Sequence, residues 1–240
     1  MKGAFPLNKS FSLGLRHGVP IALGYLAVSF AFGISAVSGG LSPIQALLIS
    51  MTNVTSAGQV AGLSLMLQGG SLLQMAVTQF TINLRYALMS LSLSQRLDSS
   101  MDTLQRMFFA FCNTDEIFAV ASSQPERVGK KYLHGLMLTP YLGWSTGTLL
   151  GAVAGSLLPP FFRSALTIAL YGMFLAIVLP PAREKKAVRV VALIAAGCSL
   201  CLRYVPGLNS IGSGYAIILC AVIASGIGAA LFPIDEEVRS

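Results

Sequence analysis

The chain has 240 residues, of which 54% are hydrophobic and 10% are charged, and its formal net charge is +7. No Lys, Arg, Asp or Glu occurs between Arg16 and Arg85, which excludes a soluble globular protein, because such a protein needs charged surface helices. The basic residues cluster beside apolar segments instead of along one face, so the net charge indicates membrane orientation and no nucleic-acid partner. We therefore expect an integral protein of the lipid bilayer.

Eight apolar segments follow one another along the chain. At about 1.5 Å rise per residue, each is close to the length that crosses a bilayer core of about 30 Å. Their bounds are near 18–38, 43–67, 70–93, 104–123, 133–157, 164–181, 187–204 and 210–232. The sequence therefore predicts an all-α polytopic membrane protein with about eight transmembrane helices in a single transmembrane domain over residues 1–240.

The distribution of Lys and Arg predicts the orientation of these spans. If the N-terminus is cytoplasmic and all eight segments cross, the cytoplasmic side holds 11 basic residues and the other side only 4. Clusters at 124–131 and 182–189 dominate this bias. We expect a multi-pass protein with both termini, and both of these loops, in the cytoplasm.

Three short matches at one offset indicate an internal duplication. "HG" at 17–18 recurs at 134–135, "LSP" at 41–43 recurs as "LPP" at 158–160, and "NLRY" at 83–86 recurs as "CLRY" at 201–204. The repeat halves would cover about 11–123 and 128–232. Eight spans make the halves parallel, whereas transporter repeats are often inverted, so both arrangements stay open.

Polar residues gather inside the second apolar segment, in "SMTNVTSAGQVAG" at 50–62. Asn53, Ser56 and Gln59 are candidate substrate-binding residues, because a polar, glycine-containing stretch in a span can mark an unwound helix whose N–H groups face an anionic ligand. Close helix packing through small residues and hydroxyl groups explains the same stretch equally well.

Arg85 lies inside the third apolar segment, where a charge costs at least about 2.5–3.5 kcal/mol and therefore needs a partner. Counting about 1.5 Å per residue from the connection near residues 94–104 places Arg85 roughly 13 Å and Asp115 roughly 16 Å from the same surface. The two are level enough to pair. The pair either locks two helices together or serves a substrate, with Asn83 of the same "NLRY" motif nearby.

Glu116 follows Asp115 and points about 100° further round the helix, so we expect it to lack an obvious partner if Arg85 pairs with Asp115. It could stay protonated, or face an aqueous cavity and take up a coupling proton. The sequence contains no serine in a nucleophile motif, and "CSLC" at 198–201 lies in an apolar helix without a second Cys pair. We expect no enzymatic activity, no metal and no cofactor.

Four motifs in the first half of the chain together resemble one family. In order, they are "GVPIALGYLAVSFAFG", "AGQ", "INLRYALMS" and "NTDEIFA". They resemble the AzlC family, the large subunits of bacterial branched-chain amino acid exporters. The resemblance implies export of valine and related amino acids across the bacterial inner membrane, together with a small AzlD-type membrane subunit.

A zwitterionic amino acid needs a partner for its carboxylate, a partner for its ammonium group and an apolar surface. With the exporter implied by the resemblance, Arg85 would bind the carboxylate, Asp115 or Glu116 the ammonium group, and Glu116 would couple transport to an ion or proton gradient. The alternative is a non-transporting membrane scaffold or assembly subunit, in which the charges only bind a partner helix.

Overall fold

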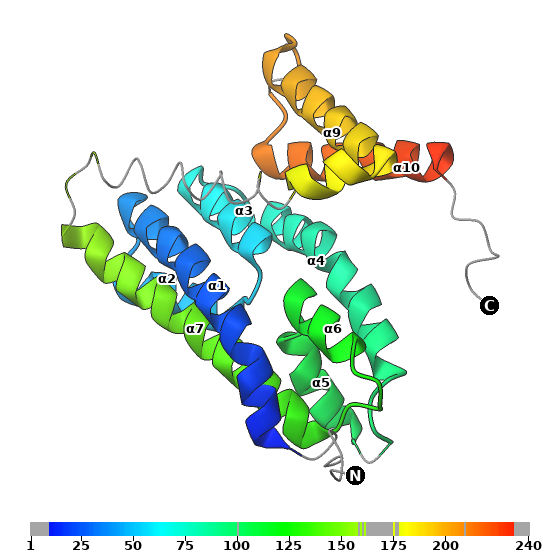
Figure 1. Ribbon diagram of the computed structural model, residues 1–240. Coiled ribbons are helices and arrows are strands. Elements are labelled where there is room, and N and C mark those ends of the chain that lie inside the picture. Colours follow the sequence, from blue (N-terminus) through cyan, green and yellow to red (C-terminus); the bar gives the residue numbers. More distant parts are fainter. Residues whose placement is uncertain are drawn as a thin grey trace. The chain divides into compact units, whose positions relative to one another are not determined.

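The computed structural model describes residues 10–99, 101–157, 159, 161, 175, 178–208 and 210–232. The regular elements of this part of the chain are helices, which confirms the all-α prediction for it (Figure 1). They are α1 (Phe11–Ser38), α2 (Pro43–Thr52), α3 (Ser56–Leu67), α4 (Leu72–Ser94), α5 (Thr103–Phe111), α6 (Asp115–Ser122), α7 (Lys130–Leu157), α9 (Lys186–Tyr204) and α10 (Ser213–Leu231).

Three of these helices are both long and apolar enough to cross a membrane: Phe11–Ser38, Lys186–Tyr204 and Gly214–Leu231. Helices α4 and α7 have 23 and 28 residues, which at about 1.5 Å per residue also reach across a bilayer core. The predicted span at 164–181 lies mostly outside the described residues. The count of eight spans and the internal duplication therefore stay predictions.

Two predicted spans differ from the structure in the same way. Segment 43–67 is not one helix but α2 and α3, separated at residues 53–55, and segment 104–123 is α5 and α6, separated at residues 112–114. Both breaks contain Asn and Thr, whose side chains bond to the nearby backbone and favour helix ends over helix interiors. Of the two interpretations left open for 50–62, the structure has the interrupted helix, and a second break, at 112–114, was not predicted.

Side chains accept hydrogen bonds at the starts of three of the four short helices beside the breaks. Ser42 and Gln45 form a capping box at the start of α2, with Pro43 as the first residue of the helix. At the start of α3, the Gly58 N–H donates to Thr55 Oγ1 over 3.4 Å. Asp102 accepts from the Gln105 N–H and begins α5. Three of the four half-helices, α2, α3 and α5, therefore have a start signal in the sequence.

The described residues pack as two units, each of which we describe by itself. Unit 1 comprises Met1–Val60 and Ile82–Leu170, and unit 2 comprises Ala61–Thr81 and Tyr171–Ser240. In unit 1 a buried apolar cluster holds α5 and α6 against the first turns of α7 and the end of α4. Its members are Leu93, Leu97, Met101, Phe109, Cys112, Ile117, Ala121, Val128, Tyr132, Leu133, Leu136 and Met137.

Helices α1 and α7 form the most extensive helix pair of unit 1 and run in the same direction (Figure 1). The contacts advance by four residues in both helices together. They pair Gly14 with Gly135, Gly18 with Thr139, Ala22 with Gly143, Leu26 with Gly147, Phe30 with Gly151 and Ile34 with Gly155. A Cβ at Gly151 would overlap the Phe30 carbonyl oxygen, so the backbones of the two helices are in direct contact.

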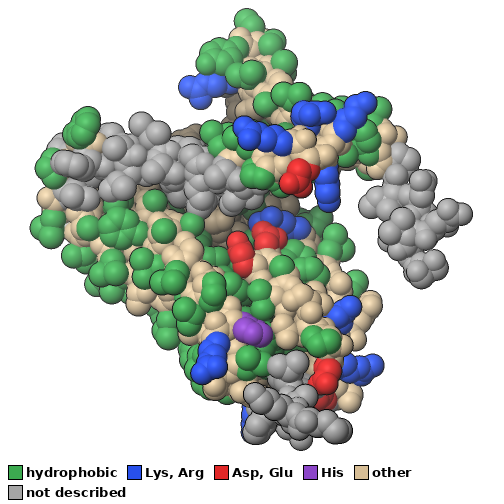
Figure 2. All heavy atoms as spheres, in the orientation of Figure 1, with side chains coloured by type: hydrophobic (Ala, Val, Ile, Leu, Met, Phe, Trp, Pro, Cys, Tyr) green, Lys and Arg blue, Asp and Glu red, His purple; other side chains and the backbone are tan. Residues whose placement is uncertain are grey.

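The outer side of this helix pair is apolar. Figure 2 shows hydrophobic side chains over much of the surface that α1 and α7 present. Those exposed include Val19 and Leu23 on α1 and Leu142, Leu150 and Val153 on α7. In water such a surface would be costly, whereas in a bilayer it faces acyl chains of the same polarity.

In unit 2, α9 packs against α10, and a Cβ at Gly228 would meet the Val191 side chain at 2.5 Å. Gly214 of α10 lies against Leu65 of α3 and Thr78 of α4. Small residues thus set the helix contacts of this unit as well.

The parallel α1–α7 pair leads to a prediction on topology. Two parallel spans begin on the same side of the membrane. Cysteines in Ser10→Cys and Glu126→Cys should therefore be accessible from the same side, and the cysteine in Ser38→Cys from the other side. The Lys/Arg bias places Ser10 and Glu126, together with Glu184, in the cytoplasm. In a background without the four native cysteines, an impermeant thiol reagent should label only Ser38→Cys in intact cells. External labelling of Glu126→Cys and Glu184→Cys would show that the orientation is the reverse of the predicted one.

Candidate functional site

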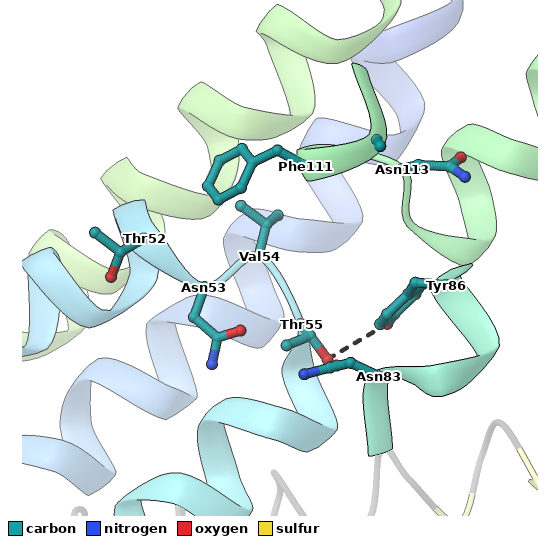
Figure 3. A pocket seen from close by; sticks show the side chains of 9 residues that line it. Thr52, Asn53, Val54, Thr55, Asn83, Tyr86, Phe111 and Asn113 are labelled. Carbon is teal, nitrogen blue, oxygen red and sulfur yellow. Dashed lines mark hydrogen bonds between the residues drawn. The ribbon is translucent and has the colours of Figure 1, made fainter. Parts of the chain in front are cut away.

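The two helix breaks of unit 1 meet at a small cavity. Its volume is about 190 Å³, and it lies between the α2–α3 break, α4 and the α5–α6 break. The residues around it, most of them labelled in Figure 3, are Thr52, Asn53, Val54, Thr55, Asn83, Tyr86, Ala110, Phe111 and Asn113. The volume is below the range of about 300–1,000 Å³ typical of drug-sized ligands, so the cavity suits a small molecule.

Neutral polar groups and apolar side chains share the lining of this cavity. The Tyr86 hydroxyl donates to Thr55 Oγ1 over 3.4 Å, which links α4 to the α2–α3 break (Figure 3). Asn113 donates from Nδ2 to Ser90 Oγ over 3.0 Å, which links α4 to the α5–α6 break. Helix α4 therefore holds both breaks in place through side-chain hydrogen bonds. Val54 and Phe111 supply apolar surface.

Arg85 lies directly beside this lining. Its Nη2 donates to the Tyr86 hydroxyl over 2.9 Å, and its guanidinium carbon lies 4.8 Å from the centre of the Tyr86 ring. The guanidinium group thus makes a hydrogen bond and a cation–π contact with a residue of the cavity. One chain of contacts runs from Arg85 through Tyr86 to Thr55.

The predicted pair of Arg85 with Asp115 is confirmed. Arg85 Nη1 lies 2.9 Å from Asp115 Oδ2, and the two side chains are 48% and 46% exposed. Asp115 is the first residue of α6, where the positive end of the helix dipole also favours a carboxylate. Since half of each charged side chain is accessible on unit 1, the pair can exchange its bond for bonds to a ligand.

The prediction that Glu116 lacks an obvious partner is wrong. The Tyr25 hydroxyl of α1 lies 2.5 Å from Glu116 Oε2 and 2.5 Å from Thr114 Oγ1. The prediction considered only helices adjacent in sequence, whereas α1 reaches α6 across the fold. The role of Glu116 in coupling stays a prediction.

The remaining predicted residues are spread over three environments. Asn53 and Asn83 lie on the cavity. Ser56 begins α3 just past the break. Gln59 is instead 1% exposed in a separate polar cluster, where its Nε2 donates to Ser50 Oγ over 2.9 Å and Ser50 contacts Thr148 over 2.6 Å. Gln59 thus joins α2, α3 and α7 and does not line the cavity.

The sequence analysis named none of Tyr25, Tyr86, Thr55 and Asn113 as a site residue, although Thr55 belongs to the polar stretch at 50–62. A signal existed for Tyr86, which follows Arg85 in "NLRY", and for Asn113 and Thr55, which belong to the two helix breaks. Tyr25 had no local signal, because a tyrosine in an apolar helix is as typical of a packing residue as of a hydrogen-bonding one.

These features define the chain as an integral membrane protein, helical throughout its described regular elements, with two broken helices around a small cavity of polar and apolar side chains. The sequence model of the family described as "AzlC protein" matches residues 20–158, and the chain belongs to the AzlC family. The matched region contains both helix breaks and every residue of the cavity.

Two relatives extend the similarity beyond this region. The chain is 33% identical over 210 residues to an "Uncharacterized membrane protein" of Archaeoglobus fulgidus, covering 86% of this chain and 91% of the relative. It is 28% identical over 196 residues to "Inner membrane protein YgaZ" of Escherichia coli K12, covering 79% and 80%. Both names describe membrane proteins, as predicted here. No solved structure matches the chain.

Proposed function

We propose that this protein is a transporter that exports branched-chain amino acids such as L-valine across the bacterial inner membrane, driven by a proton or ion gradient. The observation that carries the proposal is the meeting of two broken helices at one small cavity, beside an arginine that lies in an apolar segment. Broken helices of this kind supply backbone dipoles and polar groups for substrates in secondary transporters.

The charges beside the cavity match those of a zwitterion. In the proposed complex the substrate carboxylate bonds to Arg85 and the substrate ammonium group bonds to Asp115. One protein ion pair is thereby exchanged for two protein–substrate pairs, so the net charge of the region stays the same. This exchange avoids leaving either charge without a partner in a membrane span, which would be costly.

The apolar part of the lining accounts for the substrate side chain. Val54 comes from the α2–α3 break, Ala110 and Phe111 come from the end of α5, and together they give a short aliphatic chain a surface to contact. The neutral side chains of Asn53 and Asn83 provide further hydrogen-bonding groups. A cavity of about 190 Å³ favours a small substrate over a large aromatic one.

The small AzlD-type subunit enters the proposal through the family. The export assay therefore uses inverted membrane vesicles that contain the protein with and without this subunit. We expect labelled valine to accumulate in vesicles with an imposed proton gradient, and the accumulation to vanish when a protonophore collapses the gradient. A folded complex that moves no valine in either case would contradict the proposal and favour the non-transporting scaffold.

A further inference from the structure

The Tyr25 hydroxyl links α1 to Thr114, which precedes α6, and to Glu116 in the first turn of α6. Tyr25 is 8% exposed, and its ring packs edge-on against Trp144 of α7 with 5.1 Å between the ring centres. Its hydroxyl oxygen lies 2.5 Å from both Glu116 Oε2 and Thr114 Oγ1. The packing of the ring fixes the oxygen, so only hydrogen atoms need to move within this group of three side chains.

Because the Tyr25 hydroxyl has one hydrogen, it can donate to only one of its two neighbours at a time. When Glu116 is ionised, it can only accept, so Tyr25 donates to Glu116 and Thr114 donates to Tyr25. When Glu116 is protonated at Oε2, it donates to Tyr25, and Tyr25 donates to Thr114. The two hydrogen-bonded contacts are kept in both states, with their direction reversed.

We propose that Thr114, Tyr25 and Glu116 form a hydrogen-bond relay that links protonation of Glu116 to the cavity, with Tyr25 as the positioning residue. The inference rests on the proposed transport function and adds the path by which a proton acts on it. Protonation adds one proton to the Glu116 carboxylate and breaks no covalent bond. The hydroxyl hydrogens of Tyr25 and Thr114 only turn about their C–O bonds.

Thr114 connects this relay to the cavity, because it lies between a cavity residue and the acidic residue that pairs with Arg85. Thr114 precedes α6, but its side chain makes no cap hydrogen bond to that helix and instead contacts Tyr25. Its neighbours are Asn113, on the cavity, and Asp115, paired with Arg85. Protonation of Glu116 releases the Thr114 hydroxyl hydrogen for another acceptor at this break, between the two residues that contact the proposed substrate region.

The surroundings of Glu116 contain other charged and titratable groups. Asp115 is its neighbour on α6, Arg85 and Tyr86 lie on α4, and Tyr25 lies on α1. Arg85 is engaged by Asp115 and Tyr86, whereas Glu116 bonds to the neutral hydroxyl group of Tyr25. The Glu116 side chain is exposed on unit 1, so its proton can exchange with water while Tyr25 and Thr114 stay buried.

The first test measures proton coupling in proteoliposomes with labelled valine and a pH-sensitive dye. We expect Tyr25→Phe, which keeps the ring, to retain valine exchange but to lose proton-driven accumulation by about ten-fold or more. Glu116→Gln should give the same phenotype, and the double variant should be no worse than either single variant. Thr114→Val should also uncouple transport from the proton gradient. Thr114→Ser, which keeps the hydroxyl group, should retain the coupling. Full proton-driven accumulation by folded Tyr25→Phe would overturn the proposal.

The matched control is Tyr132→Phe. This variant removes the hydroxyl of another buried tyrosine. The Tyr132 hydroxyl oxygen lies 2.7 Å from His17 Nδ1, and neither residue lines the cavity. This variant should keep full proton coupling. Loss of coupling in Tyr132→Phe equal to that in Tyr25→Phe would assign the effect to any lost buried hydroxyl and would also overturn the proposal.

A second test needs no transport and therefore separates failure of the relay from failure of the proposed function. Infrared difference spectra of the purified protein between acidic and alkaline buffer should contain a carboxyl band that disappears in Glu116→Gln. In Tyr25→Phe this band should move in frequency, because the carboxyl group has lost its hydroxyl partner. An unmoved band would overturn the relay even if valine is transported, and a moved band would support it even if valine is not the substrate.

Discussion

Replacing Arg85 with lysine should leave the protein folded and lower valine export about 10- to 100-fold, since one charge-assisted hydrogen bond contributes about 1.5–3 kcal/mol. Arg85 uses two different nitrogen atoms to contact Asp115 and the Tyr86 hydroxyl. Lysine keeps the positive charge but has one nitrogen and no planar group to stack on the Tyr86 ring. The measurement is the initial rate of valine export, normalised to the amount of monodisperse protein.

The charge swap Arg85→Asp with Asp115→Arg separates the two roles of this pair. A simple lock between α4 and α6 would recover both stability and export on swapping. If the pair binds a zwitterion, stability recovers but export does not, because the carboxylate and ammonium sites have changed places. Arg96→Lys is the matched control, since the Arg96 side chain donates to the backbone carbonyl groups of Ser122 and Gln124 and does not line the cavity. Full export by both Arg85→Lys and the swapped protein would make Arg85 a structural residue.

Gly151→Ala should destabilise the protein by about 1–3 kcal/mol or more, the range for overpacked helix contacts. The added Cβ would overlap the Phe30 carbonyl oxygen, and a backbone atom cannot turn away as a side chain can. We expect this variant to unfold at a lower temperature than the wild type in detergent, measured by loss of the monodisperse peak after heating.

The control for this variant is Gly24→Ala, on the partner helix α1. A Cβ at Gly24 has no heavy atom within 4 Å, so this change should be neutral or stabilise the helix by up to about 1 kcal/mol. Equal stability of the two variants would mean that α1 and α7 do not approach as closely as described.

Local chemistry made part of the site predictable. The 1.5 Å rise per residue was enough to place Arg85 level with Asp115, because only a short segment joins α4, which contains Arg85, to α5, which leads to Asp115. The polar stretch at 50–62 correctly indicated an interrupted helix, since Asn53 and Thr55 compete with the helical backbone for hydrogen bonds. The same argument applied to Asn113 and Thr114 would have predicted the second break.

Contacts between distant segments were not predictable in this way. The partner of Glu116 lies 91 positions earlier in the chain, and nothing in the sequence around Tyr25 indicates that its hydroxyl reaches α6. Gln59 was assigned to the substrate because polar residues near a break share a segment, yet its helix turns it toward Ser50 and away from the cavity. Only the packing of α1, α2 and α7 decides which polar side chain faces which neighbour.

The repeated contact between α1 and α7 also has a mechanical consequence. Because the backbones touch at every fourth residue, a smaller slide of one helix along the other would not restore these contacts. The next equivalent position is a full step of about 6 Å away, at about 1.5 Å per residue. We therefore expect α1 and α7 to move as one rigid pair within unit 1. If the protein transports a substrate as proposed, we expect the short half-helices to move at their breaks while the α1–α7 pair stays fixed.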